Sequence, residues 1–298
     1  MSKRYPVIAV TGSSGAGTTL VKRAFEHIFR REGIKAAVVE GDSYHSLNRR
    51  DFMAAVETAE LNYQRAPSHF GPEVNHFDKL EECFRQYGET GSCKRRYYLH
   101  SAEEAEEHSI RLGTMFPPGE FTPWEDIPDG SDVLFYEGLH GGVVTDAVDI
   151  RKHVDFLIGV VPIVNLEWIQ KIHRDCKERG YSPEAVTATI LRRMRDYVSY
   201  VCPQFSRTHI NFQRVSTVDT SNPFIARDIP TPDESFIVIR FTYPEMANFP
   251  LLLTMIKDSF MSRPNTIVVP GGKMGFAMEI ILTPQIKRLM AAAKTERL

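Results

Sequence analysis

The sequence predicts an α/β fold in which helices cover both faces of a doubly wound, mostly parallel β-sheet. An apolar run at residues 7–10 ends in a glycine-rich turn and leads into a segment with helical spacing. Two further apolar runs, at 133–136 and 156–161, lack the alternation of a half-exposed strand. Parallel strands buried on both faces have this continuous apolar pattern. Strand-like and helix-like segments then alternate toward the C-terminus, as in doubly wound folds.

The elements of the first half follow from local spacing. Apolar side chains at Val21, Phe25, Ile28 and Phe29 recur with a helical period, which predicts a helix over 19–31. Residues 36–39 form the second expected strand. The segment from about 50 to 132 has weaker periodicity and more polar, Gly and Pro residues. We interpret it as a helix-containing insertion or lid.

The second half continues the same alternation. We expect Asn165 to cap a helix that ends near Glu178, and Ser182 followed by Pro183 to begin another helix. A length of 298 residues, at about 150 per domain, would allow two domains. No linker long enough to separate two domains is visible, so we expect a single domain over residues 1–298. Further strands and helices are expected at 215–218, 236–241, 250–260, 266–269 and 274–293.

The composition is that of a globular protein with balanced charge. Apolar residues make up 42% and charged residues 25%, which excludes disorder and fibrous classes. Thirty-six Lys and Arg against 38 Asp and Glu give a net charge of −2. The chain therefore lacks the bulk positive charge that would favour a nucleic acid or an anionic membrane as partner. Any bound anion must be held by local groups.

The sequence also bears on localisation. The longest apolar run, at 156–164, is about half of the ~18 residues needed to cross a membrane. The apolar run at 6–10 is too short for the core of a signal peptide. We expect a cytoplasmic protein whose cysteines are ordinary buried thiols, because they show no C-x-x-C pair or zinc-ligand spacing. These cysteines are Cys83, Cys93, Cys176 and Cys202.

A glycine-rich loop, GSSGAGTT, follows the first strand and opens the first helix. It matches the G-x-x-x-x-G pattern followed one residue later by Ser or Thr. Backbone N–H groups of such a loop surround phosphate oxygens, and the hydroxyl of Thr19 is suited to Mg²⁺. This motif predicts a P-loop NTPase-like fold, although a glycine-rich turn that binds nothing is the alternative. The expected binding residues are Gly12, Ser13, Ser14, Gly15, Ala16, Gly17, Thr18, Thr19 and Leu20.

The loop lacks its usual lysine, because position 18 is threonine. Another cation must then neutralise the bound phosphate groups. Lys171, Arg174 and Arg179 share one helical face with Asp175 in the helix expected after 156–161. A solvated helix with weak i,i+4 ion pairs is the alternative interpretation of this cluster.

Two carboxylates follow predicted strands. Asp42 comes after the second strand and precedes His45 and Arg49, and Glu137 ends the apolar strand at 133–136. Ligands of open α/β sheets bind beyond the carboxyl ends of the strands. Asp42 therefore lies where a general base is expected. Glu137 resembles a Walker-B acid that holds Mg²⁺ or its water shell. Either acid alone could be a strand-end cap, and their joint placement with the glycine-rich loop favours a function.

Six motifs together carry a resemblance that spans nearly the whole chain and is weakest at about 64–132. They are GSSGAGTT at 12–19, EGDxxHxxxR at 40–49, FYEGLHG at 135–141, NLEWIQKIHRDxxxRGY at 165–181, DTSNPF at 219–224 and SRxN at 262–265. The chain resembles the bacterial phosphoribulokinase family. The segment at 165–181 is the most specific of the six, whereas the glycine-rich loop alone would fit any small-molecule kinase.

The resemblance implies transfer of the γ-phosphoryl group of MgATP to the C1 hydroxyl of D-ribulose 5-phosphate, which gives ribulose 1,5-bisphosphate for carbon fixation. Asp42 is then the expected general base, Lys171 supplies charge to the transition state, and Asp175 is a further catalytic carboxylate. Which of Asp42 and Asp175 does more of the proton transfer stays open. The expected metal contacts are Thr19, Glu137 and Asp175, and the expected sugar-phosphate contacts are His45, Arg49, His100, Arg174 and Arg179. Near His100, the pair Arg95 and Arg96 is at least as well explained by a solvated charge run.

The resemblance also bears on regulation. Plant-type relatives carry a cysteine in the glycine-rich loop, whereas Ser13 and Ala16 leave this loop without a thiol. The resemblance to bacterial members implies a homo-octamer that is activated by NADH and inhibited by AMP. Because no G-x-G-x-x-G fingerprint is present, an NADH site would have to form between subunits. The expected effector contacts are Arg31, Arg193, Arg240 and Arg263. The alternative is that these side chains are surface or interface arginines paired with local acids.

Two other functions compete with this interpretation. A related kinase of a nucleoside or small alcohol, of the uridine kinase or pantothenate kinase type, would share the core and a base like Asp42. A neutral acceptor gives no reason for His45, Arg49, Arg174 and Arg179 to converge, whereas a sugar phosphate does. A nucleotide sensor that binds ATP without turnover is the second alternative, which the threonine at position 18 suggests. The presence of Asp42, Lys171 and Asp175 argues against it.

Overall fold

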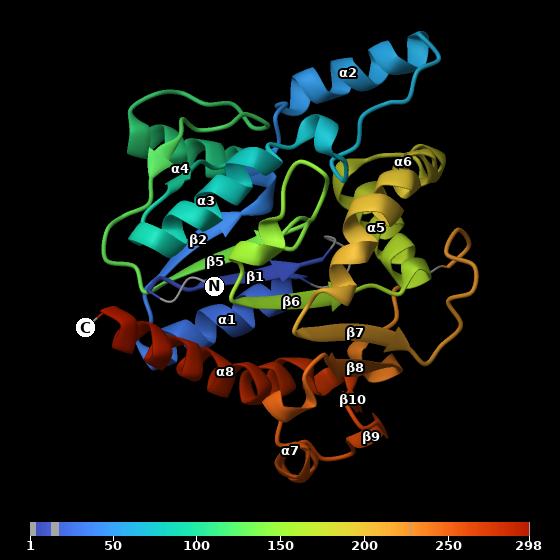
Figure 1. Ribbon diagram of the computed structural model, residues 1–298. Helices are drawn as coiled ribbons and strands as arrows, with labels where there is room; N and C mark the ends of the chain where they lie inside the picture. Colours follow the sequence, from blue (N-terminus) through green and yellow to red (C-terminus); the bar gives the residue numbers. More distant parts are fainter. Residues whose placement is uncertain (1–3, 13–17, 227, 298) are drawn as a thin grey trace.

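An eight-stranded β-sheet forms the centre of the computed structural model, which describes residues 4–12, 18–226 and 228–297 (Figure 1). The strand order is β2-β5-β1-β6-β7-β8-β10-β9. A small antiparallel pair lies apart from it, formed by β3 (Lys94–Arg95) and β4 (Glu125–Asp126). The bounds of the main strands are β1 Val7–Thr11, β2 Ala36–Glu40, β5 Val133–Gly138, β6 Phe156–Val161, β7 Ile210–Ser216, β8 Ser235–Phe241, β9 Phe260–Arg263 and β10 Thr266–Pro270.

The strand directions confirm the predicted mostly parallel, doubly wound sheet. Strands β2, β5, β1, β6 and β7 pair in parallel, and β8, β10 and β9 extend the sheet with antiparallel pairs. From β1, the chain later adds β5 on one side and β6 on the other. The carboxyl end of β1 is therefore a topological switch point, where open α/β sheets bind their ligands.

Helices cover both faces of the sheet (Figure 1). Helices α1 and α8 lie along the lower face in the figure, and α3 lies over β2, β5 and β1 on the upper face. Helices α5 and α6 stand at the carboxyl ends of the parallel strands, and α2 projects from the upper rim. The helix bounds are α1 Thr18–Glu32, α2 Arg49–Leu61, α3 Phe77–Thr90, α4 Ala102–Leu112, α5 Val164–Arg179, α6 Pro183–Asp196, α7 Phe249–Met255 and α8 Met274–Arg297.

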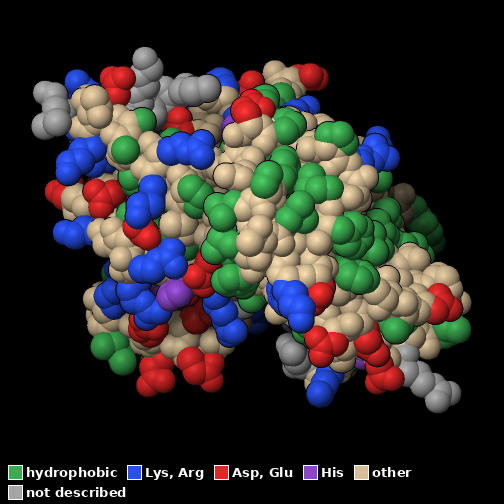
Figure 2. Space-filling view, turned by 90° about the horizontal axis from the view of Figure 1, so that it is seen from below, with side chains coloured by type: hydrophobic (Ala, Val, Ile, Leu, Met, Phe, Trp, Pro, Cys, Tyr) green, Lys and Arg blue, Asp and Glu red, His purple; other side chains and the backbone are tan. Residues whose placement is uncertain are grey.

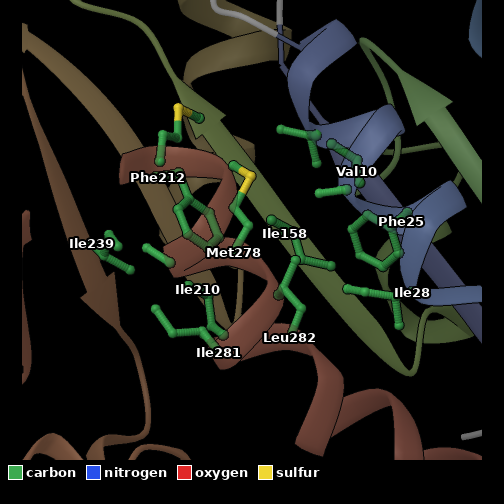
Figure 3. Packing of buried hydrophobic residues seen from close by; sticks show 14 of the residues in the cluster. Val10, Phe25, Ile28, Ile158, Ile210, Phe212, Ile239, Met278, Ile281 and Leu282 are labelled. Atoms are coloured by element: carbon green, nitrogen blue, oxygen red, sulfur yellow. The ribbon is translucent and has the colours of Figure 1, made fainter. Parts of the chain in front are cut away.

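Alternate side chains of the strands supply two separate cores. Ile8 and Val10 point into a core shared with α1 and α8, whereas Val7 and Ala9 point into a core shared with α3. Because successive side chains of a strand point to opposite faces, a fully buried strand must be apolar at every position. Figure 3 shows the first core, where α8 places Met278, Ile281 and Leu282 against sheet residues including Ile158, Ile210, Phe212 and Ile239.

The predicted helix start at Asn165 is wrong. Helix α5 begins at Val164, Ile163 is its N-cap residue, and no side chain accepts a capping hydrogen bond there. Asn165 lies inside the first turn, where its Nδ2 donates to the carbonyl oxygen of Ser221 at 3.3 Å. The side chain joins α5 to the loop after β7, a contact that local sequence does not reveal.

Three boundaries in the second half also differ from the expectation. Strand β7 runs from Ile210 to Ser216, so the predicted strand at 215–218 captures only its end. Residues 250–260 are divided between α7 and the start of β9. Helix α8 extends past residue 293 to Arg297, whose guanidinium donates to the carbonyl oxygens of Arg4 and Asp132. These contacts with the start of β1 and of β5 hold the last helical turn.

The segment at 50–132 is only partly a lid. Helix α3 buries Leu80, Phe84 and Tyr87 in the second core, so it belongs to the layer that covers the sheet. Helices α2 and α4 supply the outer part of the segment, and Leu61 and Tyr63 at the end of α2 are exposed.

Two smaller expectations concern the membrane and the cysteines. Within the part of the chain that the structure describes, no helix combines the length and the apolarity that a membrane span requires. Cys83 and Cys93 are buried thiols, as expected. Cys176 and Cys202 are half-buried thiols.

Candidate active site

The carboxyl ends of β2, β5 and β1 lie side by side and form the floor of the candidate site. Val10 in β1 and Glu40 in β2 are both in register with Glu137 in β5. A Cβ atom at Gly41 would lie 2.9 Å from the Cα of Gly138, so these two strand ends approach too closely for larger residues. The three strand ends therefore bring the two predicted carboxylates, Asp42 and Glu137, to the same edge as the glycine-rich loop.

The entrance of the glycine-rich loop is fixed to the neighbouring strand. The N–H group of Gly12 donates to the carbonyl oxygen of Gly138 at 3.1 Å. Helix α1 begins at Thr18, and the side chain of Leu20 is exposed. The predictions for Ser13, Ser14, Gly15, Ala16 and Gly17, and for the side chains of Thr18 and Thr19, lie outside the described residues.

Gln204, which was not identified from the sequence, connects the end of β1, just before the glycine-rich loop, with the segment that follows β5. Its side chain is fully buried, and its Oε1 accepts hydrogen bonds from Thr11 Oγ1 at 2.9 Å and from the Gly142 N–H at 2.8 Å. Its Nε2 donates to the carbonyl oxygens of Leu139 and Tyr200, both at 2.8 Å. The amide therefore uses two acceptor and two donor positions in hydrogen bonds. These bonds hold the end of β1 against the loop after β5.

Asp42 lies in a short 3₁₀ turn, Gly41–Tyr44, directly after β2. Its side chain is 42% exposed, which leaves room for a ligand. The Nε2 atom of His45 lies 3.6 Å from Oδ1, and the Nε2 atom of His100 lies 3.5 Å from Oδ2. The structure therefore brings together three residues that the sequence analysis assigned to one pocket.

Arg49 joins this group from the start of α2. Its Nη2 donates to the carbonyl oxygen of His100 at 3.0 Å, and its backbone N–H donates to Gly119. The exposed side chain of Arg49 thus bridges α2 and the segment that carries His100. Arg49 is therefore linked to Asp42 through His100.

His69 packs against His45 and was not identified from the sequence. Its ring stacks on His45, with centroids 4.2 Å apart, and on Phe52 of α2 at 3.9 Å. Burial is the main reason that the pKa of His69 falls to about 2. His45 is also buried. Burial is the main reason that its pKa is lowered, and the charge of Asp42 opposes this shift. Both rings are therefore neutral near pH 7.

These buried histidines predict a loss of stability in mild acid. Burial lowers the pKa of His69 to about 2 and that of His140 to about 3, whereas unfolded histidine titrates near 6.5. The unfolded chain then takes up protons below pH 6.5 and the folded chain does not, so each group lowers the free energy of unfolding by about 1.4 kcal/mol per pH unit. We expect urea unfolding to show a free energy lower by roughly 2–3 kcal/mol at pH 5.5 than at pH 7.0. His140→Asn should make this dependence shallower; an unchanged slope would contradict the assignment.

A second charged cluster lies on α5. Lys171 Nζ donates to Asp175 Oδ2 at 2.5 Å, and Arg174 Nε donates to Asp175 Oδ1 at 3.1 Å. Asp175 is only 4% exposed, so both cations are held at one buried carboxylate. Burial lowers the pKa of Lys171, and the contact with Asp175 opposes this shift. The shared helical face predicted for these three residues is confirmed, and the side chain of Arg179 lies outside the described residues.

The two clusters lie within electrostatic range of each other. The charges of Lys171 and Arg193 both contribute to the low pKa of His69, after burial and together with His45. Arg193, on α6, also contributes after burial to the lowered pKa of Lys171, and its guanidinium lies 5.9 Å from the Phe70 ring centroid. Arg193, which the sequence analysis grouped with remote effector contacts, therefore acts electrostatically on residues of both clusters.

The other three expected effector arginines lie elsewhere. Arg31 in α1 pairs with Glu279 of α8 at 3.1 Å and donates to Thr283. Arg240 and Arg263 are exposed and face each other across Thr266 of β10, on the sheet face that α8 does not cover. The four arginines do not meet within one chain.

Glu137 is the carboxylate of β5 beside the end of β1, the strand that leads into the glycine-rich loop. It is the penultimate residue of β5, and Lys22 of α1 forms an ion pair with the adjacent Glu40 at 2.7 Å. In the described part of the chain, no three His, Cys, Asp or Glu side chains form a cage for a metal ion. Mg²⁺ in kinases is held by one or two carboxylates plus phosphates and water, so a single acid at this position fits Mg²⁺.

Comparisons with known proteins point to one family. Residues 7–221 match the family described as phosphoribulokinase / uridine kinase. The chain is 60% identical over 294 residues to the chromosomal phosphoribulokinase of Cupriavidus necator, with 99% of each chain covered. It is 55% identical over 297 residues to phosphoribulokinase 2 of Cereibacter sphaeroides, with 100% of each covered. The solved structure of phosphoribulokinase from Rhodobacter spheroides is similar, with a TM-score of 0.88 and 52% identity over 98% of this chain and 99% of that one.

Proposed function

We propose that this chain, which belongs to the phosphoribulokinase / uridine kinase family, is an ATP-dependent kinase that phosphorylates the C1 hydroxyl of D-ribulose 5-phosphate. The products are ribulose 1,5-bisphosphate, which serves carbon fixation in the Calvin cycle, and ADP. Relatives named phosphoribulokinase match the chain over its full length.

One observation within the molecule carries the choice of acceptor. His45 and His100 flank Asp42, Arg49 donates to the carbonyl oxygen of His100, and the charges of Lys171 and Arg193 act on the neighbouring His69. A sugar phosphate brings a dianion that the charges of Arg49, Lys171 and Arg193 compensate, and the arginine fork suits its oxygen atoms. A neutral acceptor such as uridine would leave this charge without a counterpart.

Asp42 acts as the general base in this proposal. Its half-exposed carboxylate can accept the proton of the C1 hydroxyl, while the oxygen of that hydroxyl attacks the γ-phosphorus. The neighbouring imidazoles of His45 and His100 orient the carboxylate from two sides. The transferred group needs little covalent help, so positioning and charge compensation supply most of the rate.

Lys171 replaces the charge that Thr18 does not supply. It approaches from α5, and its buried contact with Asp175 fixes the ammonium group in one place. Arg174 shares the same carboxylate, so Asp175 holds two cations toward the transferred phosphoryl group. In this arrangement Asp175 supports phosphoryl transfer mainly through Lys171 and Arg174, and Asp42 does most of the proton transfer.

ATP binds at the glycine-rich loop with Mg²⁺ beside it. Glu137 and the hydroxyl of Thr19 would hold the ion, directly or through water, and Asp175 is a further candidate ligand. The bound ion would neutralise charge on the β- and γ-phosphate groups. The N-terminus of α1 adds positive potential at the same place.

The proposal includes control by NADH and AMP in a homo-octamer. Arg240 and Arg263 on the exposed sheet face, and Arg31 on the layer of α1 and α8, would contribute contacts at subunit boundaries. Figure 2 shows hydrophobic side chains gathered on the underside of the molecule. Helix α7, the lowest element in Figure 1, exposes Leu251 and Met255. Such surfaces are typical of assembly interfaces.

An acceptor panel tests the function. ADP release is measured with MgATP and D-ribulose 5-phosphate, uridine, pantothenate or D-ribose 5-phosphate, each with and without NADH. We expect turnover only with D-ribulose 5-phosphate and a higher rate with NADH. Turnover with a neutral acceptor would contradict the assigned role of the cation cluster, and ATP binding without turnover on any acceptor would favour a sensor.

A further inference from the structure

Arg96 is half-buried beneath the turn that carries Asp42. It follows β3, and its Nε donates to the carbonyl oxygen of Ser43 at 2.7 Å. Its Nη2 donates to the carbonyl oxygen of His45 at 2.5 Å. The interpretation of this segment as a solvated charge run is therefore wrong for Arg96.

Aromatic rings fix the plane of this guanidinium. Its Cζ lies 3.7 Å from the centroid of Phe121 and 4.6 Å from that of Trp124. The Trp124 ring in turn packs edge-on against Tyr44, with centroids 5.4 Å apart. Burial lowers the pKa of Arg96 to about 10, so the group keeps its charge near pH 7.

The two carbonyl groups that Arg96 contacts, those of Ser43 and His45, belong to the turn that carries Asp42. His45 N–H donates to the Asp42 carbonyl oxygen at 3.2 Å, and Ser43 Oγ donates to the Glu40 carbonyl oxygen at 2.5 Å. These bonds close the turn locally, and Arg96 anchors it to the segment at 94–100. A planar fork with two N–H groups can hold both carbonyl oxygens at once, which the single ammonium group of lysine cannot do in the same geometry.

We propose that Arg96 is a positioning residue for phosphoryl transfer, because its guanidinium fixes the backbone of the 42–45 turn and so orients the Asp42 carboxylate and the His45 ring. The inference rests on the proposed function, in which Asp42 is the base. Arg96 acts through these two residues, and its contacts are with carbonyl oxygens and aromatic faces.

The test compares Arg96→Gln, Arg96→Lys and the matched control Arg95→Gln. Arg95 is the adjacent arginine and donates to a different carbonyl oxygen, that of Val38, at 3.0 Å. A misplacement of about 1 Å costs roughly a hundredfold in rate. We therefore expect R96Q to lower kcat about a hundredfold with an unchanged KM for ATP. R96K should recover part of kcat, and R95Q should keep kcat within about twofold.

A spectroscopic readout separates positioning from general loss of structure. Histidine NMR titration follows His45, which is faced by Asp42, His100, His69, Arg193 and Arg96. Removal of the Arg96 charge should move the His45 titration to higher pH in R96Q and leave it in place in R95Q. If R96Q does not fold, the folded R96K variant takes its place in the same titration and should show altered His45 chemical shifts.

The double variant D42N/R96Q distinguishes this inference from the proposed base. If Arg96 acts through Asp42, the double variant should be no slower than D42N alone, because the effects are not additive. Full additivity would overturn the inference, as would a folded R96Q with wild-type kcat. Wild-type activity of D42N would overturn the proposed base instead, while the His45 titration would still test the contact with Arg96.

Discussion

Asp42→Asn is expected to lower kcat about a thousandfold while the KM for ATP stays within a few-fold of its wild-type value. The substitution keeps the size of the side chain and removes the group that accepts the proton of the C1 hydroxyl. Positioned general bases contribute roughly 10²–10⁴-fold, and the loss falls on kcat because the interaction is made in the transition state. Steady-state kinetics with D-ribulose 5-phosphate measure both constants.

Asp51→Asn is the matched control for this prediction. Asp51 lies in the first turn of α2 with a side chain 49% exposed, close to the 42% of Asp42. We expect its kcat to stay within about twofold of wild type. A thousandfold loss in both variants would indicate general damage, and a folded D42N with nearly full kcat would transfer the role of base to Asp175.

Lys171→Met should be the second most damaging change, with a loss of about a hundredfold or more in kcat. Methionine keeps the apolar part of the side chain and removes the charge that lies 2.5 Å from Asp175. Removal of one group that stabilises developing charge costs roughly 10²–10³ in kcat. Single-turnover kinetics at saturating ATP, which isolate the transfer step, are the measurement.

Lys177→Met, an exposed lysine on the same helix, serves as the control for Lys171→Met. It should retain wild-type kcat. If K171M raised only the KM for ATP and left the transfer step unchanged, Lys171 would bind the ground state without stabilising the transition state, and the proposed compensation for Thr18 would be wrong.

Much of the site could be predicted because its signals are local. Asp42 and Glu137 follow apolar runs that had to be buried parallel strands, and the carboxyl ends of such strands share one edge. Lys171 and Asp175 are four residues apart in a helix, so their contact follows from helical geometry. These inferences required only the order of the elements and their periods.

The residues that support the site could not be found in this way. Gln204 contacts Thr11 across 193 positions, and Arg96 contacts Ser43 across 53 positions. Nothing in the local sequence of either residue indicates its partner. The error at Asn165 has the same origin, since its amide binds a loop 56 positions away.

Helix α3 is a different case, because its signal was present. Leu80, Phe84 and Tyr87 are spaced by four and three residues, as expected for one helical face. Because 50–132 was interpreted as one insertion, the apolar spacing of this helix was not separated from the polar segments around it. A shorter window would have predicted a helix that covers the sheet.

The most direct test of the central claim is phosphorus NMR of the product formed from MgATP and D-ribulose 5-phosphate. We expect stoichiometric ADP and a sugar bisphosphate whose new phosphomonoester couples to the C1 methylene protons. Release of inorganic phosphate without a bisphosphate, or a new phosphate at any other hydroxyl, would contradict the assigned reaction.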